Sequence, residues 1–445
     1  MQNNSKFEKM TQAPVEKLIC TLALPTIISM MISTIYNTAD TYFAGKINTN
    51  AVAAIGIAYS FMSIIQAFGF WYGHGSGNFI SRMLGKKNLE DAESMASLGL
   101  LFSICTGIIF AICTVIFGEY IAIILGGNEL IKEDIVSYLK MLSFGIPFIM
   151  GGLTLNNQFR YQGNALLGMI GITVGGILNI ILDPVFMFVL GFGVKGAGIA
   201  TSISQFISFF LLLYLNKKCD NVKYSLRSIK YSINNVKTLY LGGLPNFTRE
   251  AIASIAVLML NHAVKGYGEV AIAAFTVINR IIMLLGAVMI GFGQGFQPVC
   301  AYNYGAGFYK RVKKALYFSL GVSTVFFLIM TVICLKTAEN ILGFFSSDSA
   351  VIEMGTLILK YQCISIPIMG WIIISGMFLQ NLGRFKQATI VSAARQGIFF
   401  IALIVILPHL FGLYGIILVQ PLADIGTFLI SFLMGIKAIV SMDGV

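Results

Sequence analysis

The 445-residue chain carries very few charged residues for its length. Only 11% of its residues are charged, 57% are hydrophobic, and the mean hydropathy is +0.83. In an ordinary soluble domain about a quarter of the residues are charged. This composition excludes an ordinary soluble protein and predicts an all-α membrane protein.

Cysteine, histidine and the common enzyme motifs are also sparse or missing. The seven cysteines form no CxxC pair, and the few histidines are isolated, so we predict no disulfide framework and no metal site. The glycines of 73–77 lie beside or within an apolar run, where they favour helix packing over phosphate binding. We found no P-loop, nucleophile triad or dinucleotide fingerprint. We therefore expect neither an enzyme nor an ATP-driven pump, and no cofactor.

Long uncharged runs predict membrane-spanning helices, each of which needs about 20 apolar residues. The last run, 397–423, should turn near Pro408-His409 and Gly412, because a further span continues past Asp424 to about Gly435. A weaker span lies near 239–262. Together the runs predict twelve spans; the uncharged ones are 18–39, 47–81, 94–118, 141–159, 161–182, 196–216, 281–309, 315–335, 361–383 and 397–423.

The chain repeats itself at an offset of 220 residues. Pro25 and Pro147 recur at this offset as Pro245 and Pro367, although the chain has only nine prolines. The repeat predicts two six-helix lobes, residues 1–216 and 239–445, joined by a cytoplasmic linker at 217–238. Duplicated halves are a common plan of secondary transporters, whose substrate path lies between the halves.

Basic residues concentrate in alternate loops. If the N-terminus is cytoplasmic, sixteen basic residues fall in cytoplasmic loops and seven fall outside, which follows the positive-inside rule. We therefore expect a multi-pass protein with both termini in the cytoplasm, and basic clusters that set orientation and contact lipid headgroups. Gly85 and Gly305 adjoin two of these clusters and are expected to let the preceding helix end sharply.

Two acids fall inside predicted spans of the N-terminal lobe. Charges inside a membrane mark ion or substrate pathways by default, and the acids are Asp40 and Asp183. Asn179 lies four residues before Asp183 and so shares its helix face. Pro184 removes a backbone donor and favours a bend. With the hydroxyl of Thr201, these groups predict an oxygen-rich site of the kind that hard cations prefer.

Two alternatives stay open for these acids. Asp183 could instead form a structural hydrogen bond that joins two helices. If Asp40 and Asp183 approach each other, their repulsion and desolvation let the pair bind either a sodium ion or a proton. The sequence does not choose between the two ions.

The C-terminal lobe lacks this acid pair, because leucines stand at both matching positions, 260 and 403. Its polar residues predict an ion-pair network among Arg249, Glu250 and Arg395 that locks helices together. Cation coupling is then expected in the N-terminal lobe. The polar residues assigned to this C-lobe network are Arg249, Glu250, Arg395 and Gln396.

Over essentially its full length the chain resembles the bacterial branch of the multidrug and toxic compound extrusion (MATE) family. The resemblance implies two six-helix lobes around a central cleft, in the cytoplasmic membrane of a bacterium. It also implies export of cationic amphipathic compounds in exchange for sodium or protons. The motifs that carry it are the proline-bearing first span ending in 36–40, the glycine-rich second span leading to 81–85, and the segments 179–184 and 301–305.

The resemblance assigns residues as well. It implies a cation site at Asp40, Asn179, Asp183 and Thr201, and a substrate cavity lined by Tyr36, Asn37 and Asn156. The chain departs from relatives with acids in the seventh and tenth spans: Glu250 fits the first loosely, and no acid lies between Tyr361 and Leu382. We expect a monomer that meets small organic cations and membrane lipid, and no nucleic acid.

Two functions other than drug export are also compatible with a membrane protein of this kind. A flippase for lipid-linked saccharides, from the same superfamily, would handle anionic carriers and need several cationic side chains in its cavity. Only Arg249 and Arg395 are available, against Asp40 and Asp183. A receptor or channel without transport is disfavoured by the duplication and its unequal buried charge. The sequence thus favours an antiporter for organic cations.

Overall fold

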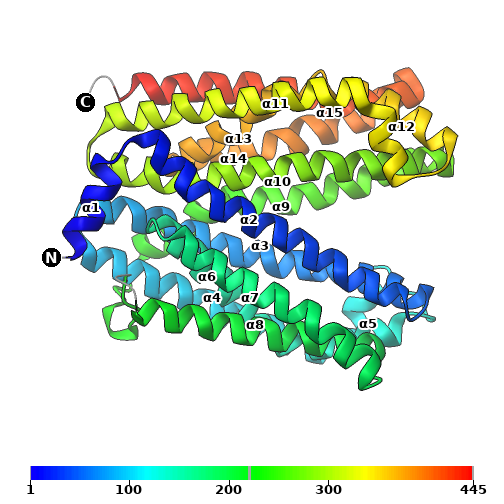
Figure 1. The fold of residues 1–445 in the computed structure, drawn as a ribbon, viewed down its shortest axis with the longest axis horizontal. Helices are drawn as coiled ribbons and strands as arrows, with labels where there is room; N and C mark the ends of the chain where they lie inside the picture. The colour runs from blue at the N-terminus through cyan, green and yellow to red at the C-terminus, as the bar shows by residue number, and fades with distance from the viewer. Residues whose placement is uncertain (1, 219–221, 443–445) are drawn as a thin grey trace. The chain divides into compact units, whose positions relative to one another are not determined.

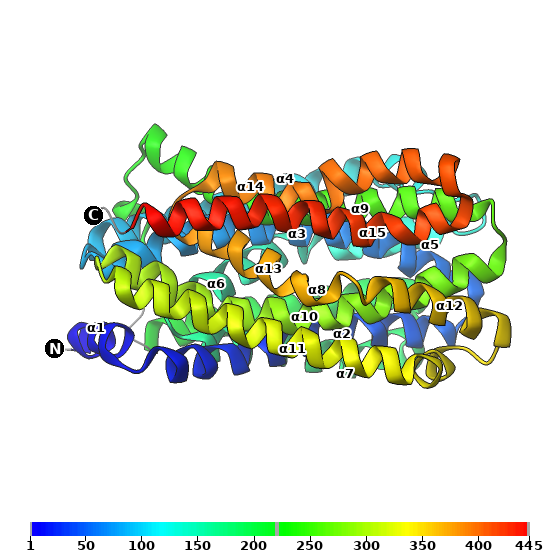
Figure 2. The same cartoon turned by 90° about the horizontal axis from the view of Figure 1, so that it is seen from above.

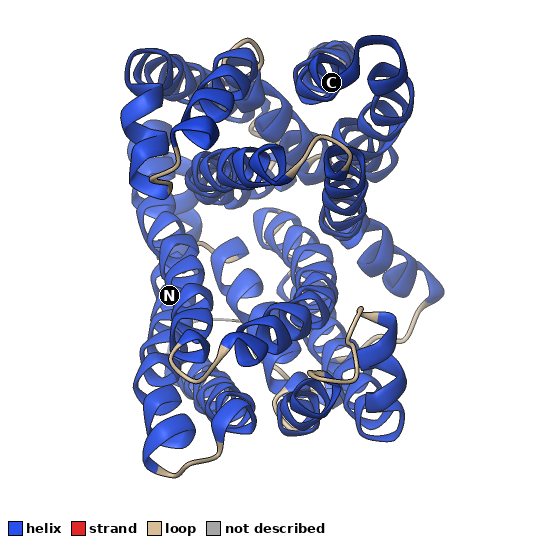
Figure 3. Ribbon diagram, turned by 90° about the vertical axis from the view of Figure 1, so that its right-hand side faces the viewer, coloured by secondary structure: helices blue, strands red, loops and turns tan. Residues whose placement is uncertain are grey.

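The computed structural model describes residues 2–218 and 222–442, with only the backbone described at 2–5, 37 and 38. Throughout these ranges every regular element is a helix (Figure 3). The α-helices are α1 (Gln2–Gln12), α2 (Val15–Gly45), α3 (Thr49–Gly85), α4 (Leu89–Ile124), α5 (Lys132–Ser143), α6 (Ile146–Tyr161), α7 (Ala165–Pro184), α8 (Gly193–Lys218), α9 (Ile233–Lys265), α10 (Glu269–Gly305), α11 (Tyr309–Phe345), α12 (Ser349–Gln362), α13 (Ile366–Asn381), α14 (Phe385–Ala393) and α15 (Phe400–Val440) (Figure 1). Two π-helices, η1 (Val185–Val189) and η3 (Ala394–Phe399), and one 3-10 helix, η2 (Leu226–Ser228), complete the set.

The helices account for the expected membrane spans. In the described part of the chain, eight helices are long and apolar enough to cross a membrane, and the bent pairs α5–α6 and α12–α13 raise the number to ten. Two further spans of the expected twelve correspond to α9 and to the second arm of the long segment Phe385–Val440. That segment breaks at Gly412, whose φ is +57° and ψ −134°, so the predicted turn is confirmed (Figure 2).

Contacts within the chain divide it into two compact units. The first unit comprises Met1–Gly243 and Ala301–Gly307, and the second comprises Leu244–Cys300 and Phe308–Val445. In the first unit α3 packs on α4 and α6, and α7 lies between α2 and α8. In the second unit α13 packs against α11 and α15. The end of α10 thus belongs with the first unit, although the rest of that helix belongs to the second.

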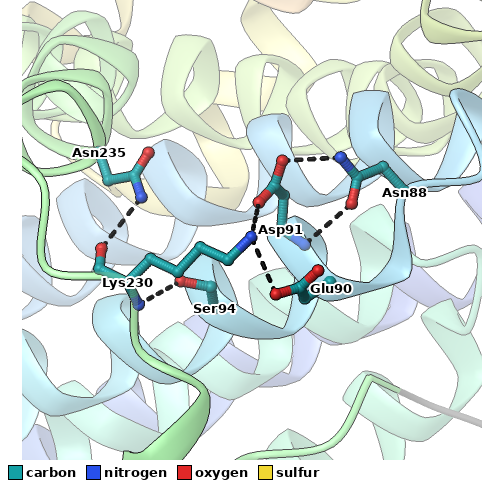
Figure 4. A network of polar contacts seen from close by, with 6 residues as sticks. All are labelled: Asn88, Glu90, Asp91, Ser94, Lys230 and Asn235. Atoms are coloured by element: carbon teal, nitrogen blue, oxygen red, sulfur yellow. Dashed lines mark hydrogen bonds and ion pairs between the residues drawn. The ribbon is translucent and has the colours of Figure 1, made fainter.

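The described part of the linker is bound to the surface of the first unit. The backbone N–H of Lys230 donates to Ser94 Oγ at 2.8 Å, and its Nζ lies 2.8 Å from Asp91 Oδ1 and 3.0 Å from Glu90 Oε1 (Figure 4). These three partners stand in the first turns of α4. The linker is therefore fastened to the start of α4, where one basic side chain meets two acids.

A second set of bonds holds the start of the linker over α6. The hydroxyl of Tyr224 donates to Gln158 Oε1 at 2.7 Å, and the N–H of Val222 donates to Gln162 Oε1 at 2.8 Å. Gln158 is fully buried, and its amide nitrogen donates to Ser76 Oγ at 2.8 Å. Residues of the linker thus form part of a buried polar network in the first unit.

Gly85 and Gly305 end their helices, as expected, and have a second role in packing. A Cβ atom on Gly85 would lie 2.1 Å from the carbonyl oxygen of Tyr302, and one on Gly305 would lie 2.1 Å from that of Arg82. The backbone with positive φ stands two residues later, at Lys87 (60°) and Gly307 (78°). Helices α3 and α10 do end at the two glycines, but the residues after them make the turn, and the glycines also let the ends of the two helices touch.

The N-terminal helix α1 covers this contact. The side-chain amide of Asn303 donates to the carbonyl oxygen of Met10 at 3.1 Å, and the rings of Phe7 and Tyr302 lie 5.9 Å apart. Lys87 places its ammonium group 4.4 Å from the centre of the Phe7 ring. Met10 is 2% exposed, so α1 is packed onto the first unit at the end where α3 and α10 meet.

Candidate functional site

Three helices of the first unit bring the four predicted cation-site residues together. Asp40 stands on α2, Asn179 and Asp183 stand on α7, and Thr201 stands on α8. All four side chains are buried, with Asp40 the most exposed at 6%. Helix α2 is more than a hundred residues from α7 and α8 in the chain, and α7 packs against both of the others.

Two adjacent glycines explain how α7 fits between its neighbours. A Cβ atom on Gly176 would lie 3.2 Å from the Tyr36 ring of α2, and one on Gly175 would lie 3.1 Å from Ser208 of α8. Because neither residue has a side chain, both helices can approach α7 closely. The pair precedes Asn179 by about one helical turn, so the close approach occurs beside the site.

The site is held by hydrogen bonds from one amide group. Asn179 Nδ2 donates to Asp183 Oδ1 and to Thr201 Oγ1, both at 3.3 Å. The carboxyl groups of Asp40 and Asp183 also lie close enough to hydrogen-bond when one of them holds a proton. A single asparagine thus orients the acid of its own helix and the hydroxyl of α8 toward each other.

Three oxygen atoms of this cluster lack a donor. Among the residues that the structure describes, Asp40 Oδ1, Asn179 Oδ1 and Asp183 Oδ2 are buried and accept no hydrogen bond. A buried acceptor without a partner costs about 1–3 kcal/mol, and a charged one costs more. Oxygen ligands are those that hard cations prefer, and a proton between the two carboxyl groups would also relieve the deficit. These oxygen ligands therefore fit either a sodium ion or a proton.

The helical pattern changes directly after the second acid. The α-helix ends at Pro184, where the sequence predicted a bend, and the chain continues as the π-helix η1. The N–H of Leu190 then bonds to the carbonyl of Val185 at 2.9 Å. Short π-helical segments of this kind occur often at functional sites.

Tyr138 is a neighbour of the site that the sequence did not suggest. It lies on α5, is 2% exposed, and places its hydroxyl near Thr201 and both acids. Tyr138 and Thr201 are more than sixty residues apart, and no spacing in the sequence links α5 to α8. Only the packing of α5 against α8 makes the tyrosine part of the site.

The predicted cavity residues do not all gather here. Tyr36 lies one turn before Asp40 on α2 and faces Gly176. Asn156, on α6, packs against Gly168, with its Nδ2 2.7 Å from where a Cβ atom would stand. Gly168 lies eleven residues before Asn179, or about 16 Å along the helix. The structure therefore brings Tyr36 to the cation site and leaves Asn156 apart; the side chain of Asn37 lies outside the described residues.

The polar network predicted for the second unit is not the one observed. Arg249 pairs with its neighbour Glu250 on α9, at 2.9 Å. Arg395 instead pairs with Asp424, with Nε 2.7 Å from Oδ1. Gln396 makes no side-chain hydrogen bond to any described residue. The prediction that Arg249, Glu250 and Arg395 form one network was wrong, because the acid that neutralises Arg395 lies on α15 and not on α9.

Asp424 is the centre of a second buried polar cluster. It is 1% exposed and accepts hydrogen bonds from Gln420 Nε2 at 2.8 Å and from Ser365 Oγ at 3.0 Å, besides that from Arg395. Gln420 stands one turn before it on α15, and Ser365 lies at the bend between α12 and α13. The sequence placed Asp424 in the last span without giving it a partner.

Comparison with known proteins places this architecture in a family. The sequence model of the MatE family matches residues 25–185 and again 245–406, two segments that begin 220 residues apart. The multidrug export protein MepA of Staphylococcus aureus strain MRSA252 is 30% identical over 437 residues, covering 96% of this chain and 95% of that protein. MepA of Staphylococcus saprophyticus is 28% identical over 435 residues, again covering 96% of this chain and 95% of its own length.

Solved structures agree on the fold. A crystal structure of MATE in complex with MaL6 superposes with a TM-score of 0.92 at 23% identity, covering 98% of this chain and 99% of the other. An outward-facing multidrug resistance MATE family transporter of the MOP superfamily gives 0.90 at 24% identity, with 98% of each chain covered. The repeated match, the similarity to MepA along nearly the whole length and the shared twelve-helix fold lead to one assignment: the chain belongs to the MatE family.

Proposed function

We propose that this protein is a secondary antiporter that exports cationic amphipathic compounds in exchange for Na⁺ or H⁺. The observation that carries the proposal is the set of three buried oxygens without donors between α2, α7 and α8. Membership of the MatE family and the names of the MepA relatives, which are multidrug export proteins, support the same direction of transport.

Each residue of the cluster has a role in this proposal. Asp40 and Asp183 supply the negative charge that attracts the coupling ion, and Asn179 and Thr201 supply neutral oxygens. Two carboxylates so close together in a buried site are costly unless a cation or a proton neutralises them. Release of the coupling ion and arrival of another cation are therefore linked, because the charged pair is unstable when left empty.

We also propose that the ends carrying residues 82–87 and 310–314 face the cytoplasm of a bacterial cell, together with both termini. The excess of basic residues in these loops supports this orientation. In a protein without native cysteines, a cysteine at position 195 should react with an impermeant thiol reagent added to intact cells. A cysteine at position 226 should not react, and its labelling from outside would contradict the orientation.

The flippase alternative has less support. A cavity for an anionic lipid carrier needs several cationic groups that no acid neutralises, whereas the first unit holds two buried acids, and Arg249 and Arg395 in the second are each paired with an acid. The monomeric state remains an expectation.

The proposal is tested by drug export from proteoliposomes under separately imposed sodium and proton gradients. Asp183→Asn keeps the size of the side chain and removes its charge, so gradient-driven export should fall to background while folding is retained. Asp40→Asn should act in the same way. Asp134→Asn in the first turn of α5 is the matched control and should transport normally. Normal export per folded molecule by Asp183→Asn would overturn the site assignment.

A further inference from the structure

Arg395 uses only one edge of its guanidinium group within the protein. Its Nε donates to Asp424 Oδ1 at 2.7 Å, and it makes no other hydrogen bond or ion pair to the residues that the structure describes. The side chain is 22% exposed, against 1% for that of Asp424. The two Nη amino groups, with four N–H bonds, are thus left for a partner outside the described contacts.

The arginine is held firmly in this orientation. Asp424 is fixed from two further directions by Gln420 and Ser365, at 2.8 and 3.0 Å. Arg395 itself is the second residue of the π-helix η3, and a Cβ atom on Gly397 would lie 3.1 Å from the Ile252 side chain of α9. A guanidinium anchored through Nε presents a planar pair of donors in a defined direction, which is the geometry that carboxylates accept.

Arg395 lies deep in its span, and this depth makes it unfavourable for its two Nη groups to face lipid tails. α14 begins at Phe385, so Arg395 lies ten residues, or about 15 Å, from the helix end, near the middle of a hydrocarbon layer about 30 Å thick. A guanidinium turned toward lipid tails at that depth is strongly unfavourable. Its Nη groups therefore face a polar space or a polar ligand.

We propose that Arg395 is a specificity-determining residue that binds the carboxylate of zwitterionic export substrates through its two Nη groups. This inference rests on the proposed function and names a substrate class for it: amphipathic amines that also carry a carboxylate. The Asp424–Arg395 pair has no net charge, so a simple organic cation gains nothing from it. A carboxylate gains two charge-assisted hydrogen bonds that its ester cannot form as well.

The test compares matched compounds in proteoliposomes that contain the full chain. The probes are an aromatic carboxylic acid with a basic amine, its methyl ester, and tetraphenylphosphonium, a permanent cation without a carboxylate. Arg395→Lys keeps the positive charge beside Asp424 but removes the planar pair of Nη amino groups. We expect it to reduce kcat/KM for the acid by about 10- to 100-fold, while the ester and tetraphenylphosphonium change less than twofold. Arg384→Lys is the control, since it makes the same substitution eleven residues earlier, at the half-buried residue before α14, which bonds to Ser441.

The outcomes separate this inference from the proposed function. If wild-type protein exports none of the three probes under either gradient, the proposed function fails. If it exports all three and Arg395→Lys lowers them equally, the arginine is structural and the inference is overturned. If the variant does not fold, the neutral double variant Arg395→Gln/Asp424→Asn is measured in its place. A wild-type protein that does not prefer the acid to its ester would refute the inference without any variant.

Discussion

Alanine at Gly85 is expected to weaken the contact between the ends of α3 and α10. In the structure this contact is backbone against backbone: a Cβ atom on Gly85 would stand 2.1 Å from the Tyr302 carbonyl oxygen, and one on Gly305 would stand 2.1 Å from that of Arg82. The obstructing atoms are main-chain oxygens of helices and cannot rotate away. The two helix ends must therefore separate.

The size of the effect follows from this geometry. Separations below 3.0 Å are essentially never seen for real Cβ atoms, so α3 and α10 must move apart by roughly 1 Å. Excess volume in a packed contact costs about 1–3 kcal/mol. A transporter that alternates between states bears this cost only in the state where the ends touch, so the population of that state should fall about 5- to 150-fold relative to the other.

A buried reporter on α10 measures the change. Ala301 is 0% exposed, so a cysteine placed there, in a protein without native cysteines, should react slowly with a thiol reagent in permeabilised liposomes. Adding Gly85→Ala should speed its labelling by about 5- to 150-fold, and Gly305→Ala should do the same because its contact mirrors the first. Gly56→Ala is the control on the same helix, since nothing lies within 4 Å of a Cβ atom there.

Two results would refute this reasoning. If Gly85→Ala labels no faster than Gly56→Ala and unfolds at the same temperature, then α3 and α10 do not touch in the populated state. If its unfolding temperature falls but the labelling rate stays unchanged, the contact exists and is not opened during transport. Met10 of α1 also covers this end, so removal of α1 should add to the effect of Gly85→Ala.

The linker supports two further predictions. Tyr224→Phe removes the donor to the fully buried Gln158 and should lower the free energy of unfolding by about 1–3 kcal/mol, whereas Tyr231→Phe, at a 70% exposed side chain, should not; thermal unfolding compares the two. Hydrogen bonds to Asp91 and Glu90 raise the pKa of Lys230 above its usual value, so its contribution should be present at neutral pH and be lost as pH rises past about 10.5. Because the pair is exposed, Lys230→Ala should cause a small decrease in unfolding temperature that vanishes in 1 M salt; a large decrease that persists in salt would contradict this interpretation.

The residues of the proposed cation site could be singled out in the sequence because their signals were local or repeated. Asn179 and Asp183 share a helix face by their spacing, Pro184 marks the change of helix after them, and a charge inside an apolar run stands out. The turn at Gly412 followed in the same way from the length of an apolar run. Each of these inferences needed only helix geometry and the thickness of a membrane.

The partner of Arg395 could not be found in this way. Glu250 and Asp424 were both acids in predicted spans, and the sequence gave no means to decide which of them packs beside the arginine. Tyr138 joined the cation site for the same reason, through the packing of α5 on α8. Such choices depend on how helices distant in sequence are arranged, and no periodicity encodes that arrangement. The sequence likewise predicted a linker at 217–238 but not its attachment to the first unit, because its hydrogen bonds to α4 and α6 leave no pattern in the sequence.

The repeat shows how one arrangement of helices came to hold two different polar sites. At the offset of 220 residues, Asp183 corresponds to Leu403, whereas Asp424 corresponds to Ser204, three residues after Thr201. Arg395 corresponds to Gly175, the residue that lets α7 approach α8. In the first unit the acids stand on the first and fifth spans, and no basic side chain among the described residues pairs with them. In the second unit the acid stands on the last span, and the preceding span supplies an arginine to neutralise it. The fifth span of each unit thus takes part in a polar site, which holds two acids in one unit and a neutral pair with free donors in the other. This division suits an exchanger in which one unit binds the coupling cation and the other selects among its substrates.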